Sequence, residues 1–141
     1  MISEFSFSIP SRLLSLRMLK NDFYHTKGDL SQNEAGEYVL PIHFNADHAI
    51  FGGHFPEMKV VPGVTMVQIV KETLEDIVAK PTRMVKSSMI KFMAIIQPEV
   101  DSDLDVHLSM KESEGVYIVT ANLKSAEKVF FKFKGEFHAA S

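Results

Sequence analysis

The 141-residue chain contains no cysteine. This absence excludes disulfides, thiolate metal sites and cysteine nucleophiles, and it suits a reducing compartment. A basic excess is also missing, because 18 Asp and Glu outnumber 15 Lys and Arg and give a net charge of -3. Nucleic-acid-binding domains normally carry a basic face. The charge balance therefore argues against a nucleic-acid partner.

Long apolar runs are missing too, since no stretch approaches the roughly 18 residues needed to span a bilayer. The N-terminal segment, residues 1–20, lacks the basic start, the apolar core and the cleavage site of a signal peptide. We therefore expect a cytoplasmic protein without a membrane segment. The length and the hydrophobic fraction of 45% predict one globular domain over residues 1–141.

The alternation of apolar and polar residues predicts antiparallel strands with one packed face and one wet face. Residues 22–26 and 37–44 are joined by a polar segment with turn chemistry, KGDLSQNEAG, and are expected to form a hairpin. After residue 80 nearly everything reads as strand. The expected strands there cover residues 84–96, 104–110, 117–123 and 129–137.

Between these two groups of strands, the sequence predicts one long helix over Gly63–Val78. Pro62 precedes it, and a proline at a helix start loses nothing because its missing N–H would have no intrahelical partner. Apolar residues keep helical spacing, whereas Lys71, Glu75 and Asp76 form a wetter side. A helix this apolar needs cover all round. We therefore predict an α+β fold in which the sheet wraps around the helix.

The segment that leads into this helix is the candidate site. A glycine pair at 52–53 precedes His54 and Phe55, and glycines permit close approach of the backbone to a ligand. The first helical turn offers free N–H groups at Gly63 and Val64, with the positive end of the helix dipole behind them. Such donors can polarise a thioester carbonyl. A histidine near that carbonyl can remove a proton from the adjacent carbon.

Each candidate also has a structural interpretation. A lone loop histidine such as His54 is more often a hydrogen-bonding residue than a catalyst. Gln68 lies in an apolar stretch, where an amide needs partners, so a satisfied core amide or one facing a partner chain are alternatives. Glu72 lies one turn further on the same face and by itself indicates an exposed carboxylate. His48 and Asp47 match no common ligand spacing, so no metal is expected.

The segment GHFPEMKVVPGV, residues 53–64, resembles the signature of the 3-hydroxyacyl-acyl-carrier-protein dehydratases. The likeness covers residues 12–138 and includes IKFMAIIQPEVD, residues 90–101, which is similar to the strand after the central helix of that family. The resemblance implies a hot-dog fold, in which a curved antiparallel sheet wraps one long helix. It also implies a homodimer or an oligomer of dimers, an active site at the subunit interface, acyl-carrier-protein substrates and no cofactor.

Carried over by position, the resemblance assigns the catalytic histidine to His54 and the carbonyl donors to the region of Gly63 and Val64. Phe55 and Pro62 belong to the same motif and are expected beside the substrate. The implied reaction is loss of water from a 3-hydroxyacyl thioester in fatty-acid or related acyl-chain biosynthesis.

The chain departs from the family pattern on the helix. The family has an acidic residue six positions after the motif proline, where this chain has Gln68, and commonly an amide four positions later, where it has Glu72. The acid and the amide have thus exchanged places. An amide cannot act as a general acid, so either residue is a candidate for orienting or protonating the leaving hydroxyl. A weakened acyl-binding homologue or partner subunit, and a hot-dog thioesterase, are the alternatives.

Overall fold

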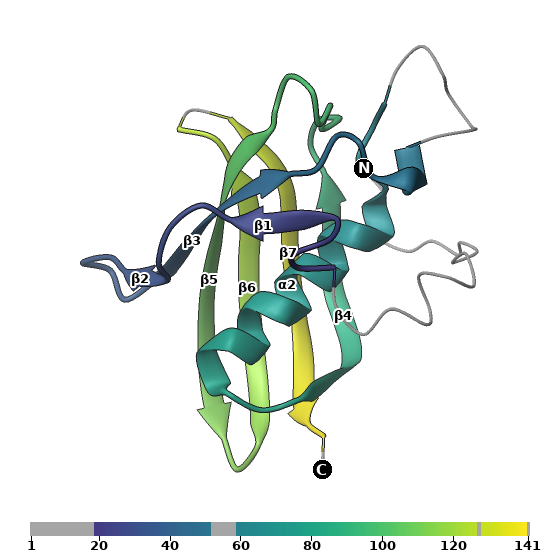
Figure 1. Ribbon diagram of the computed structural model, residues 1–141. Helices are drawn as coiled ribbons and strands as arrows, with labels where there is room; N and C mark the ends of the chain where they lie inside the picture. The colour runs from purple at the N-terminus through teal and green to yellow at the C-terminus, as the bar shows by residue number, and fades with distance from the viewer. Residues whose placement is uncertain (1–18, 52–58, 127, 141) are drawn as a thin grey trace.

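The computed structural model describes residues 19–51, 59–126 and 128–140, which form a curved antiparallel sheet and a long helix (Figure 1). The sheet has seven strands in the order β1-β3-β5-β6-β7-β4, and β2 pairs with β3 outside this path. The strands are β1 (Tyr24–Thr26), β2 (Ser31–Gln32), β3 (Tyr38–Phe44), β4 (Thr82–Phe92), β5 (Asp103–Ser113), β6 (Val116–Lys124) and β7 (Val129–Ala139). A 3-10 turn, η1 (Ala49–Phe51), precedes the long helix α2 (Gly63–Val78).

Helix α2 has the bounds that its sequence predicts. Pro62 stands before it in an extended conformation, and the helix ends at Ala79 in the left-handed region with φ 58. The N–H of Ala79 donates to the carbonyl oxygen of Glu75 at 2.9 Å, which satisfies one of the free carbonyls at the helix end. In the described ranges, no helix combines the length and the apolar character that crossing a membrane requires.

The core lies between α2 and the concave face of the sheet (Figure 1). Ile69, Val70 and Leu74 of the helix are completely buried. Along β7 the buried face is aromatic, and neighbouring ring centroids lie 6.4 Å apart for Phe131 and Phe133 and 5.9 Å for Phe133 and Phe137. Aromatic side chains bury large apolar areas. They therefore supply much of the apolar core.

The predicted hairpin is confirmed, because β1 pairs antiparallel with β3. Leu40 and Ile42 point into the core, as the alternation of β3 predicts. The polar segment after β1 is more than a turn, since its residues Ser31–Gln32 form β2 and pair with β3. The strand predicted over 84–96 begins at Thr82 and ends at Phe92.

Candidate functional site

The first turn of α2 is the described part of the predicted carbonyl-binding site. Gly63 and Val64 are half-buried there. The backbone N–H and the hydroxyl of Thr65 donate to the carbonyl oxygen of Pro62 at 3.1 Å and 2.6 Å. Within the described part of the chain, the N–H groups of Gly63 and Val64 have no acceptor, as expected for the first residues of a helix. Among the described residues, both donors are therefore unoccupied.

An aromatic ring closes one side of this turn. A Cβ atom at Gly63 would lie 2.7 Å from Cζ of Phe92, which is too close for a side chain without movement of the ring. The ring centroid of Phe92 lies 5.4 Å from that of Phe131. A side chain at position 63 would therefore displace the Phe92 ring, which forms a wall next to the N–H groups of Gly63 and Val64.

His54 and Phe55 lie outside the described residues. The described chain stops at Phe51, the end of η1, and resumes at Lys59. The ammonium group of Lys59 donates to the carbonyl oxygen of Ala46 at 2.9 Å. This bond joins Lys59, which follows the segment that contains His54, to Ala46, which precedes η1.

Glu72 is completely buried and accepts four hydrogen bonds. Its Oε1 accepts from the N–H of Lys20 at 3.0 Å and from the hydroxyl of Tyr24 at 2.9 Å. Its Oε2 accepts from the N–H of Leu19 at 2.6 Å and from Nε2 of Gln68 at 2.9 Å. All four partners are donors, and they match an ionised carboxylate, which only accepts.

The expectation that Glu72 is an exposed helix carboxylate is therefore wrong. The physical reason is that residues 19–24 cross this face of α2 and direct two backbone N–H groups and a phenol hydroxyl at it. These partners lie 48–53 positions earlier in the chain, so helical spacing carries no signal for them. Sequence reasoning missed Tyr24 as a hydrogen-bond partner of Glu72 for the same reason.

Gln68 lies between the free N–H groups and Glu72 on one face of α2, because Val64, Gln68 and Glu72 follow one another at intervals of four residues. The side chain is half-buried. Its Nε2 is bonded to Glu72, and among the described residues none donates to its Oε1. Among the described residues, Gln68 is therefore partnered through Nε2 alone.

The hydroxyl of Tyr24 belongs to the same buried network. Burial, the negative charge of Glu72 and the hydrogen bond to it raise the pKa of Tyr24 far above its usual range. An unfolded tyrosine titrates near pH 10. At a pH between the pKa of Tyr24 in the unfolded chain and its pKa in the folded chain, the unfolded chain loses a proton that the folded chain keeps. Ionisation therefore favours the unfolded state as pH rises.

We therefore expect the free energy of unfolding to fall as pH rises above about 10. Tyr24→Phe should make this decline shallower, because phenylalanine has no proton to lose. Urea unfolding of both proteins at several pH values between about 8 and 11 measures the two slopes. Equal slopes in the wild type and the variant would show that Tyr24 does not titrate in this way.

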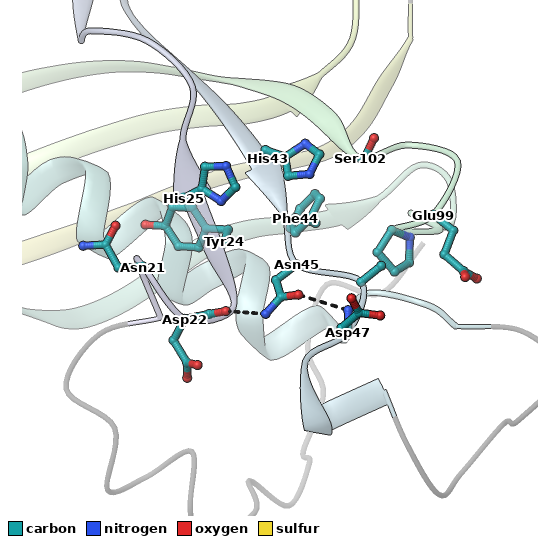
Figure 2. A pocket seen from close by; sticks show the side chains of 12 residues that line it. Asn21, Asp22, Tyr24, His25, His43, Phe44, Asn45, Asp47, Glu99 and Ser102 are labelled. Carbon is teal, nitrogen blue, oxygen red and sulfur yellow. Dashed lines mark hydrogen bonds between the residues drawn. The ribbon is translucent and has the colours of Figure 1, made fainter.

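A separate, open pocket of about 510 Å³ lies where β1 begins and β3 ends. His25 and His43 are paired across these strands, with ring centroids 5.0 Å apart, and Figure 2 shows the two imidazoles side by side. Nδ1 of His43 lies 2.6 Å from Oδ1 of Asp103. Tyr24 also lines the pocket, but no residue of α2 does. The pocket is thus distinct from the site predicted at the helix start.

His48 has partners on both ring nitrogens. Its Nε2 lies 3.0 Å from Oδ2 of Asp22, and its Nδ1 accepts from the N–H of Ile50 at 3.0 Å. Asp47, its neighbour in the sequence, is not part of this arrangement. Over the ranges that the structure describes, no group of three His, Cys, Asp or Glu side chains could hold a metal ion.

A curved antiparallel sheet around one long helix defines the hot-dog class of proteins. The model of one family within that class, ApeI-like, described as ApeI dehydratase, matches residues 30–134. Since the match covers more than half of the chain, the protein belongs to the ApeI-like family. The resemblance to dehydratases is confirmed at this level. A comparison with curated proteins gives no match.

Solved structures confirm the predicted hot-dog fold. The dehydratase heterocomplex ApeI:P from Xenorhabdus doucetiae is 19% identical, with a TM-score of 0.61 over 78% of this chain and 94% of that one. PH1136 from Pyrococcus horikoshii is 15% identical, with a TM-score of 0.58 over 100% and 96% of the two chains. BH2602 from Bacillus halodurans, solved with CoA, is 9% identical, with a TM-score of 0.56 over 80% and 74%.

Proposed function

We propose that this protein binds 3-hydroxyacyl thioesters and eliminates water from them to give enoyl thioesters. The observation that carries the proposal is the ApeI dehydratase match over residues 30–134, which includes the segment with His54. The free N–H groups of Gly63 and Val64 support it, because they can hold the thioester carbonyl. We expect the acyl chain to arrive on an acyl carrier protein and the reaction to need no cofactor.

In the proposed reaction, His54 takes the proton from C2. The C2–H electrons form the C2–C3 double bond while the C3–O bond breaks and hydroxide leaves. The N–H groups at Gly63 and Val64 stabilise the negative charge that develops on the carbonyl oxygen.

The departing hydroxide needs a proton to become water. Gln68 cannot supply one, because an amide is not a general acid. Glu72 is buried and its two oxygens are occupied by donors of its own chain. We therefore propose that His54 returns the proton it has taken, and that Glu72 acts on the site through Gln68 rather than as the acid.

The test is formation of enoyl thioester from a 3-hydroxyacyl thioester, measured by mass spectrometry. We expect His54→Ala to lower the rate by about 10²–10⁴-fold, the contribution of general acid–base catalysis. His25→Ala is the matched control, because His25 is exposed on β1 and should leave the rate unchanged. Turnover that survives His54→Ala would overturn the proposed role, and release of free thiol would instead identify a thioesterase.

A second candidate function is a catalytically weakened subunit that holds acyl thioesters or pairs with an active partner. The position of Gln68 favours it, because the residue that should protonate the leaving group is an amide. Assembly with another subunit has a parallel in the ApeI:P heterocomplex of Xenorhabdus doucetiae. In the assay above, this candidate is favoured by binding without turnover.

The edge of the sheet supports an assembled form. β4 is the last strand in the sheet order and is 11 residues long. It exposes Met84 by 41% and Val85 by 43%, and an exposed edge of this kind is suited to pairing with another chain. We propose a homodimer, or an oligomer of dimers, joined along β4. The assay is therefore done on protein whose mass in solution has been measured.

A further inference from the structure

We propose that Glu72 is a positioning residue that fixes the amide of Gln68 with its carbonyl oxygen toward the substrate. This inference rests on the proposed function, because it assumes that Gln68 lies at the site. At position 68, where the resemblance implies an acid, this chain would present a hydrogen-bond acceptor, Oε1 of Gln68. The substrate class that such a site favours is a thioester with a hydrogen-bond donor on C3.

The direction of the Gln68 amide follows from its neighbour. Glu72 already receives two backbone N–H groups, which cannot reverse their polarity, and the hydroxyl of Tyr24. A carboxylate in this environment can only accept. If the Gln68 amide turned over, its Oε1 would take the place of Nε2, 2.9 Å from Oε2 of Glu72. Two acceptors at that distance repel each other, so Nε2 must face Glu72.

The bond is also held firmly. Both residues belong to α2 and are separated by one turn, so the helix sets their spacing. Glu72 is completely buried, which keeps water from competing for its oxygens. Gln68 is only half-buried, and no described residue donates to its Oε1. Its Oε1 is therefore an acceptor that is fixed in direction and has no partner among the described residues.

An acceptor at this place selects for a donor. The O–H of a 3-hydroxyacyl thioester can donate to Oε1 of Gln68, whereas a 3-oxoacyl, enoyl or saturated chain has no donor on C3. The hydroxyl then approaches as a donor, which orients it but does not help it to leave. The site should thus bind the 3-hydroxy compound more tightly than its saturated counterpart by about ten-fold, the effect of one hydrogen bond.

The orientation is tested by NMR on the wild-type protein, without turnover. The Nε2 protons of Gln68, assigned by their loss in Gln68→Met, should exchange slowly with solvent because one of them is bonded to a buried carboxylate. Glu72→Ala, examined under conditions where its spectrum shows it to be folded, should speed this exchange. Fast exchange in the wild type would overturn the inference.

Selectivity is tested by binding to His54→Ala, which prevents turnover. The ligands are 3-hydroxyacyl and saturated acyl pantetheine thioesters of equal chain length. We expect about ten-fold tighter binding of the 3-hydroxy compound, loss of the preference on adding Gln68→Met, and a smaller preference on adding Glu72→Ala. A preference that survives Gln68→Met would overturn the inference.

The two experiments also separate this inference from the proposed function. A protected Gln68 amide and a 3-hydroxy preference without dehydration would support the positioning role and reject the dehydratase. Dehydration that depends on His54, together with an unprotected amide, would do the opposite.

Discussion

Glu72→Ala should lower the free energy of unfolding by about 3–5 kcal/mol, because it removes the acceptor of two buried donors, the N–H of Leu19 and the hydroxyl of Tyr24, and of two partly buried ones, the N–H of Lys20 and Nε2 of Gln68. An unsatisfied buried donor costs about 1–3 kcal/mol, and partial relaxation of residues 19–24 reduces the sum. Denaturant unfolding monitored by circular dichroism measures the change.

Asp76→Ala is the matched control, since Asp76 lies one turn beyond Glu72 and also binds the segment that starts at residue 19. Its carboxylate pairs with the ammonium group of Lys20 at 3.0 Å near the surface. An exposed pair of this kind contributes less than about 1 kcal/mol. A similar loss in both variants would contradict the view that Glu72 anchors this segment through buried hydrogen bonds.

Gln68→Glu should destabilise the protein at neutral pH by about 2–4 kcal/mol, because it removes the donor to Glu72 and places a second carboxylate beside it. The native contact is 2.9 Å between Nε2 of Gln68 and Oε2 of Glu72. Two carboxylates this close cannot both ionise easily, so the folded variant keeps a proton that its unfolded chain loses. The penalty is therefore small below about pH 4 and grows as pH rises toward 7.

The measurement is urea unfolding of the wild type and Gln68→Glu at several pH values between about 4 and 8. The exchange variant Gln68→Glu with Glu72→Gln is the control. It removes the like-charge contact but leaves the N–H of Leu19 facing an amide group, so it should recover part of the stability. A penalty that does not depend on pH would show that the two carboxylates do not interact.

This result bears on how the activity can be tested. Gln68→Glu alone places at position 68 the acid that the resemblance implies, but the new carboxylate lies against Glu72. A gain in activity would then be mixed with a loss of stability. The exchange variant places the acid and the amide in the order that the resemblance to the dehydratase signature implies. A rise in dehydration in that variant, compared at equal folded fraction, would indicate that the wild-type site lacks an acid.

Local sequence was sufficient for the main elements. Helical spacing and Pro62 predict the bounds of α2, and the alternation along β3 predicts which side chains enter the core. The resemblance of residues 53–64 to the dehydratase signature led to the hot-dog fold and the dehydratase family. These features depend on residues within a few positions of one another, so they can be predicted from the local sequence.

The sequence by itself determined the central helix, the antiparallel sheet, and the amide at position 68 and acid at position 72 on one face of the helix. Only the tertiary structure decided which groups these two side chains bind. Glu72 is buried because Leu19, Lys20 and Tyr24, about 50 positions earlier, fold over α2 and donate to it. Its carboxylate then accepts from Nε2 of Gln68, and no described residue donates to the carbonyl oxygen of Gln68. Hydrogen bonds between distant segments depend on packing, which periodicity along one helix does not encode.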